Sequence, residues 1–108
     1  MALSQRNLNQ RLQLQRVLED SLGSSNVYFQ PPANTKIAYP AIIYQRVAKD
    51  ERFANNLLYN NTVRYQVTVI DRDPDSFIPE KVALLPWCSF SRHFVAESLN
   101  HDVFDLYY

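Results

Sequence analysis

Residues 62–71 read TVRYQVTVID and show the most regular alternation of apolar and polar side chains in the sequence. Valine or tyrosine stands at every second position from 63 to 69. Successive side chains of a strand point to opposite faces, so this pattern predicts a strand with one buried and one polar face. The polar face consists of Arg64, Gln66 and Thr68. It is a candidate subunit interface, although a solvated surface explains the same residues.

Other segments around this strand are also rich in β-formers. Residues 27–30 (VYFQ), 41–47 (AIIYQRV), 88–96 (CSFSRHFVA) and 103–108 (VFDLYY) are expected to be strands. A loop at 31–40 contains three of the six prolines, and residues 49–61 form a long polar connection with four asparagines.

Two segments have helical periodicity. Residues 4–22 begin with a fair N-cap, Ser4, and end before Gly23, the residue type that best tolerates a helix C-terminus. The expected core-facing stripe is Leu8, Leu12, Leu18 and Leu22, with Leu14 and Val17 beside it. A shorter helix follows the turn at 73–76 and ends before Pro86, with Ile78, Val82 and Leu85 at helical spacing.

The resulting order of elements is α-β-β-β-α-β-β. Runs of strands with short connections predict an α+β fold with a mainly antiparallel sheet of four to five strands. Both helices are expected to pack on one face of that sheet. A length of 108 residues suits a single domain covering 1–108.

Charge and targeting signals restrict the function classes. Eleven basic and eleven acidic residues give a formal net charge of zero, so independent binding to nucleic acid or to an anionic membrane is not expected. The N-terminus lacks the apolar core of a signal peptide, and no apolar run reaches the ~20 residues of a membrane span. One cysteine also fits a reducing compartment. These features predict folding in the cytoplasm.

The sequence offers little for cofactor binding. A single glycine excludes glycine-rich phosphate-binding loops. Asp71, Asp73 and Asp75 alternate as in the first half of a calcium-binding loop, but the glycine and the final glutamate of that loop are missing. The preferred interpretation is that Asp73 or Asp75 caps the second helix, because a carboxylate is favoured there by free N–H groups and the helix dipole.

Neither a metal site nor an active site is expected. Cys88, His93 and His101 are one ligand short of a structural zinc site, and an odd spacing places Cys88 and His93 on opposite faces of a strand. Motifs of nucleophilic catalysis, such as Gly-x-Ser-x-Gly, are absent from the sequence. The expectation is a protein that is not an enzyme and has no cofactor. A small cytoplasmic enzyme, with a site assembled from distant residues, remains an alternative.

The C-terminal segment is unusually aromatic. Chain ends are normally polar, whereas this sequence finishes on two tyrosines. A last strand held in the sheet and a surface that meets a neighbouring subunit both explain this composition. The candidate interface residues are Phe104, Leu106, Tyr107 and Tyr108.

Four features together resemble the tail-terminator, or tail-completion, proteins of tailed bacteriophages. They are the leading amphipathic helix, YPAIIYQR at 39–46, RYQVTVID at 64–71 and LNHDVF at 99–104. In that family a "Tyr-Pro-x-Ile-x-Tyr" strand follows a loop and precedes an "Arg-x-Gln-Val-x-Val" strand. The match covers most of the chain in order and spacing.

The resemblance implies a structural virion protein that forms a ring of six on the tail tube, stops tube polymerisation and provides the head-joining surface. It implies three partners, namely further copies of the chain, the tail tube protein and the head connector. DNA would pass only as cargo through a lumen, for which Asp71, Asp73 and Asp75 are candidate lining residues. A head-completion or adaptor protein is the nearest alternative.

Overall fold

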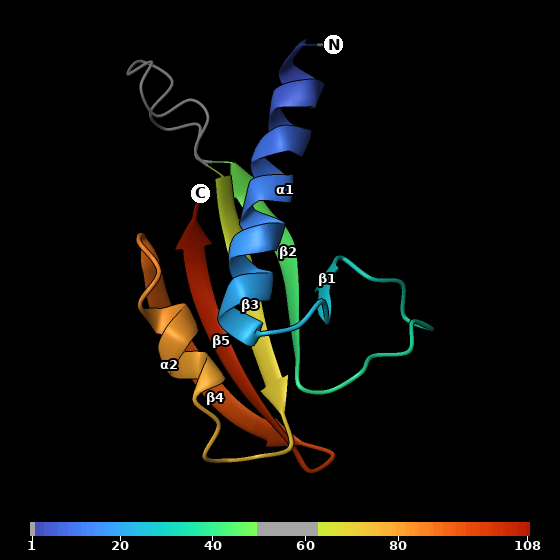
Figure 1. Cartoon of the computed structure of the whole chain (residues 1–108), viewed down its shortest axis with the longest axis vertical. Helices are drawn as coiled ribbons and strands as arrows, with labels where there is room; N and C mark the ends of the chain where they lie inside the picture. Colours follow the sequence, from blue (N-terminus) through green and yellow to red (C-terminus); the bar gives the residue numbers. More distant parts are fainter. Residues whose placement is uncertain (1, 50–62) are drawn as a thin grey trace.

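The computed structural model describes residues 2–49 and 63–108, which form two helices and five strands (Figure 1). The expected α+β class and the order α-β-β-β-α-β-β are confirmed. Most of the polar connection predicted at 49–61 lies outside the described residues. The elements are α1 (Ala2–Leu22), β1 (Val27–Phe29), β2 (Ala41–Lys49), β3 (Val63–Asp71), α2 (Ile78–Ala83), β4 (Cys88–Ala96) and β5 (Leu99–Tyr107).

The five strands form one sheet in the order β1-β2-β3-β5-β4. Strand β1 runs parallel to β2, and the three other pairs are antiparallel, so the sheet is mixed. The parallel pair arises because the loop at 31–40 returns the chain to the level at which β1 began. Val27 therefore lies beside Ile42.

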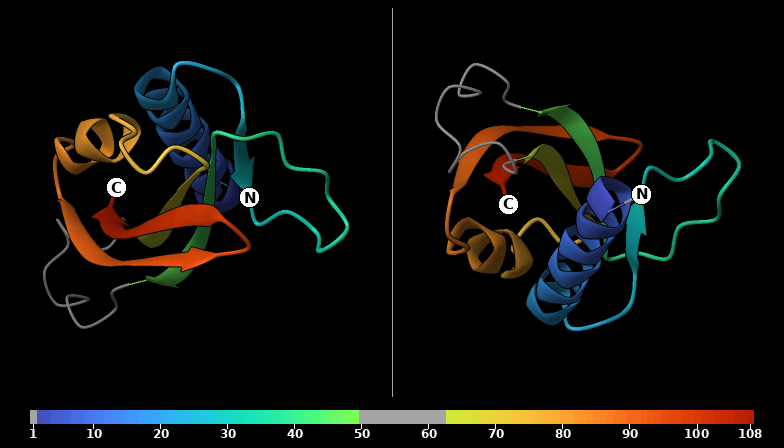
Figure 2. Two further views of the ribbon diagram at one scale, coloured as in Figure 1. Left: turned by 90° about the horizontal axis from the view of Figure 1, so that it is seen from below. Right: turned by 90° about the horizontal axis from the view of Figure 1, so that it is seen from above.

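Strand β3 is at the centre of the sheet and alternates as its sequence predicts. Its side chains at 63, 65, 67 and 69 are buried, whereas those at 64, 66 and 68 are half-buried on the other face. Both helices cover the face with the buried side chains, as the two views in Figure 2 show. Leu14 and Leu18 of α1 and Val82 of α2 complete the core there.

The leucine stripe of α1 differs from the expected one. Leu14, Leu18 and Leu22 are buried, whereas Leu8 and Leu12 are 41% and 44% exposed. The first turns of α1 extend beyond the end of the sheet in Figure 1. Leu14, Leu18 and Leu22 define the buried side of the helix, and Leu12, two residues from Leu14, faces away from it. Gly23 ends the helix as expected, with φ of 83° and its N–H donated to the Glu19 carbonyl at 2.8 Å.

A partly buried polar network fixes α1 to the sheet. Tyr44 of β2 is fully buried, and its hydroxyl donates to Oε1 of Gln15 at 2.6 Å. Nε2 of Gln15 donates to the Val27 carbonyl at 2.9 Å. Arg11 hydrogen-bonds the Tyr44 side chain and lies over the Phe29 ring, 4.4 Å from its centroid. Burial nevertheless dominates and raises the pKa of Tyr44, so its hydroxyl stays neutral.

Strand β4 contains a bulge that shifts the in–out alternation of its side chains by one residue. The register with β5 shifts between Phe90 and Arg92, so that Ser91 is an extra residue. Cys88 and His93 pair with Leu106 and Asp102, two even-numbered residues of β5. They therefore point to the same face, and the prediction of opposite faces is wrong.

The fifth strand is longer than expected. It begins at Leu99 rather than at residue 103, because Glu97 and Ser98 form a two-residue turn that pairs Ala96 with Leu99. Both turn residues have positive φ, 53° and 64°, as this tight hairpin geometry requires.

Candidate protein-interaction surface

The polar residues of β3 lie on the sheet face that no helix covers in the described part of the chain. Arg64, Gln66 and Thr68 are half-buried, and Oε1 of Gln66 accepts a hydrogen bond from Nε2 of Gln45 at 2.8 Å. This arrangement is that of a solvent-facing sheet surface with cross-strand polar pairs. It leaves the three residues accessible, as an interface would need.

An aromatic pair extends this open face toward β4. The rings of Phe94 and His101 stack with centroids 4.5 Å apart, and the Arg92 guanidinium lies 5.8 Å from the Phe94 ring centroid. Beneath them Ile70 and Val103 are buried. The contacts are those of packing and cation–π attraction, and they give no nucleophile–base pair.

The aromatic C-terminal segment divides into core and surface residues. Phe104 and Leu106 are each 1% exposed and face the helices, so the prediction that they contact a neighbouring subunit is wrong. They are buried because β5 lies between β3 and β4, with a neighbour on each side. Tyr107 is half-buried on the open face beside Arg64, and Tyr108 packs at the margin of the core.

The acidic turn caps itself rather than the second helix. The Asp73 N–H donates to Oδ1 of Asp71 at 3.0 Å, and the Asp75 N–H donates to Oδ1 of Asp73 at 2.9 Å. The N-cap position of α2 is Phe77, which has no side-chain cap, and the Ile78 N–H donates to Oγ of Ser76. The helix-cap prediction is therefore wrong: the Asp73 carboxylate accepts from the nearer Asp75 N–H, and the first helical N–H group, that of Ile78, is taken up by Ser76 and not by Asp75.

The potential metal ligands do not come together. Within residues 2–49 and 63–108, no group of three His, Cys, Asp or Glu side chains is placed to hold a metal ion. Nδ1 of His93 lies 2.9 Å from Oδ1 of Asp102, whereas His101 stacks on Phe94. Burial, and secondarily the Asp105 carboxylate, raises the pKa of Cys88 to about 11. A neutral thiol is a poor nucleophile and a poor metal ligand.

Cys88 should accordingly react slowly while the protein is folded. A shift of its pKa from 9.0 to about 11 lowers the thiolate fraction at pH 8 by roughly 100-fold, and we expect alkylation by iodoacetamide to slow by a similar factor relative to the chain in urea. Because desolvation is the larger cause, Asp105→Asn should recover only a minor part of the rate. Equal rates for the folded and unfolded chain would contradict this account.

Four large apolar side chains that the sequence patterns did not single out are exposed near α2 and the start of β4. Phe77 and Leu84 flank α2, Trp87 immediately precedes β4, and Phe90 belongs to β4. We call them the α2–β4 surface: Phe77 (72% exposed), Leu84 (85%), Trp87 (81%) and Phe90 (58%). Phe77, Leu84 and Trp87 do not fit the inward spacing of Ile78, Val82 and Leu85. That misfit is the feature of the sequence from which their exposure could have been predicted.

The backbone around this surface is also unusual. Strand β4 is the last strand of the sheet, and its outer edge has no strand partner among the described residues. All its residues after Cys88 are exposed. A bulge at Ser91 and the charged Arg92 protect this edge from pairing with another strand, so the exposed apolar side chains and not the strand edge are the candidate contact.

Trp87, immediately before β4, has a left-handed backbone conformation. Its φ is 59°, which costs a non-glycine residue roughly 1–2 kcal/mol. The Tyr107 N–H donates to its carbonyl at 3.0 Å and thereby anchors this strained residue to β5. The fold thus holds an indole ring in solvent at an energetic cost, which is a frequent property of functional positions.

The described helices include none that is long and apolar enough to cross a membrane. Comparisons with models of known protein families, with curated proteins and with solved structures gave no significant match to this chain.

Proposed function

We propose that this chain is a structural subunit of a closed ring of six identical copies that caps a bacteriophage tail tube. In this role it ends tube polymerisation and presents the surface on which the head connector docks. The α2–β4 surface is the observation that carries the proposal, and the resemblance at 39–46, 64–71 and 99–104 supports the tail-terminator role specifically.

The physical support is the amount of apolar surface left in water. Tryptophan, phenylalanine and leucine side chains each gain about 1.5–3 kcal/mol on full burial, and the four residues of the α2–β4 surface are more than half exposed. Aromatic side chains are enriched in subunit interfaces and frequently dominate their energy. A formal net charge of zero adds no long-range repulsion between copies. Assembly by surface complementarity needs no bound cofactor.

The direct test is native mass as a function of protein concentration, with the 12.6 kDa chain as the unit. We expect a species near six chains, visible as a ring with a central opening by negative-stain electron microscopy. The double variant Leu84→Ser, Trp87→Ser should shift the mass to one chain while its far-UV circular dichroism stays unchanged, because both side chains are exposed. A wild-type protein that stays at one chain up to millimolar concentration would contradict the free ring.

The position in the virion tests the tail assignment separately. In virions of the phage that encodes this chain, a tag on the exposed Lys36 loop should be detected by immunogold labelling at the head-proximal end of the tail tube. Labelling of heads that lack tails would instead assign the chain to the head-completion proteins. Removal of the gene should yield tubes of abnormal length, and tubes of normal length would oppose a terminating role.

A further inference from the structure

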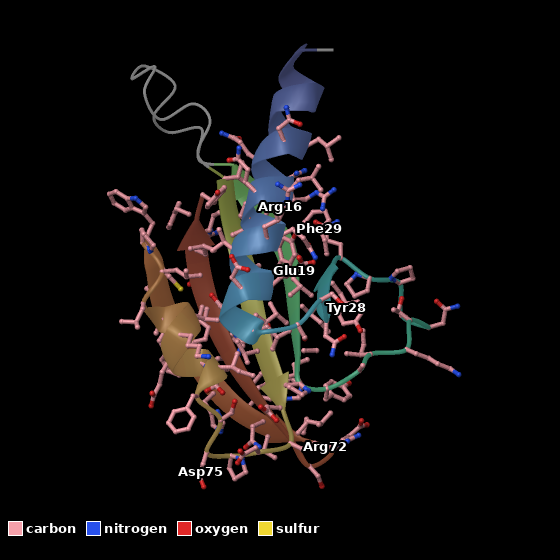
Figure 3. The ribbon with its side chains drawn as sticks, viewed as in Figure 1. Arg16, Glu19, Tyr28, Phe29, Arg72 and Asp75 are labelled. Atoms are coloured by element: carbon pink, nitrogen blue, oxygen red, sulfur yellow. The ribbon has the colours of Figure 1, made fainter. Side chains whose placement is uncertain are left out.

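We draw no further inference here: the strongest candidate, the apolar surface that Leu8 and Leu12 form on the turns of α1 before Arg16 (Figure 3), carries nothing, because Glu19 and Asp20 offset two of the three arginines of that helix, so that charge selects no occupant, and nothing in the structure shows what covers it.

Discussion

Phe104→Asp is expected to leave this chain unfolded in dilute buffer at 25 °C. Phe104 is 1% exposed, lies between Val67 and Phe90 on the neighbouring strands, and packs edge-on against the Phe90 ring at 5.6 Å between centroids. Removing a buried phenylalanine alone costs about 3–5 kcal/mol. An unpaired carboxylate in the same apolar site adds several kcal/mol more. The total is comparable with the whole stability of a domain of this size, about 5–15 kcal/mol.

Far-UV circular dichroism and a urea titration measure this effect. Phe90→Asp is the matched control, because it introduces the same charge on the adjacent strand at a position that is 58% exposed. That control should keep a cooperative unfolding transition. A native spectrum and a cooperative transition for Phe104→Asp would show that β5 is not part of the core. Since Phe104 is internal, loss of assembly in this variant would report unfolding and not the removal of a subunit contact.

Gln15→Ala is expected to destabilise the protein by about 2–3 kcal/mol. The side chain of Gln15 satisfies the Tyr44 hydroxyl at 2.6 Å and the Val27 carbonyl at 2.9 Å, and its loss leaves the fully buried Tyr44 hydroxyl without its acceptor. Each buried polar group left unsatisfied costs about 1–3 kcal/mol. Urea unfolding followed by circular dichroism gives the change in free energy.

A double-mutant cycle separates the hydrogen bond from general loss of packing. Tyr44→Phe removes the hydroxyl together with its need for a partner, so we expect it to cost less than Gln15→Ala. The two substitutions combined should cost less than the sum of the single values, by about 1 kcal/mol, because both remove the same bond. Strict additivity would mean that the 2.6 Å contact contributes no stability.

The parts of the fold that follow from local pattern could be predicted from the sequence. Strict alternation from 63 to 69 defined β3, and the end of α1 at Gly23 was predicted because a positive φ is most easily adopted by glycine. The element order was correct for the same reason, since each element has its own periodicity. The extra residue at Ser91 was not detectable, because a bulge depends on pairing with β5 and not on the composition of β4.

Which apolar residues are buried was harder to predict than which segments are regular. Leu8 and Leu12 fit a helical stripe with Leu18 and Leu22, but the buried side of α1 includes Leu14, and Leu12 lies on the opposite side of the helix from Leu14. The aromatic composition of the C-terminal segment led to the prediction of a subunit interface at Phe104 and Leu106. The strand order instead makes β5 internal and buries both side chains. Most of the α2–β4 surface was missed because Phe77, Leu84 and Trp87 fall outside the inward spacing of α2, and the exposure of Phe90 depends on the edge position of β4.

The internal position of β5 has a consequence for synthesis on the ribosome. Residues 99–107 form β5, which is synthesised after all the other strands but lies between β3 and β4 in the sheet. Until they emerge, β3 in the nascent chain has one unpaired edge and β4 lacks its partner. Closing the sheet also joins residues as distant as Arg64 and Tyr107, which is slow compared with hairpin formation. Newly made chains therefore pass through a state with exposed strand edges, in which association with other nascent chains competes with completion of the sheet.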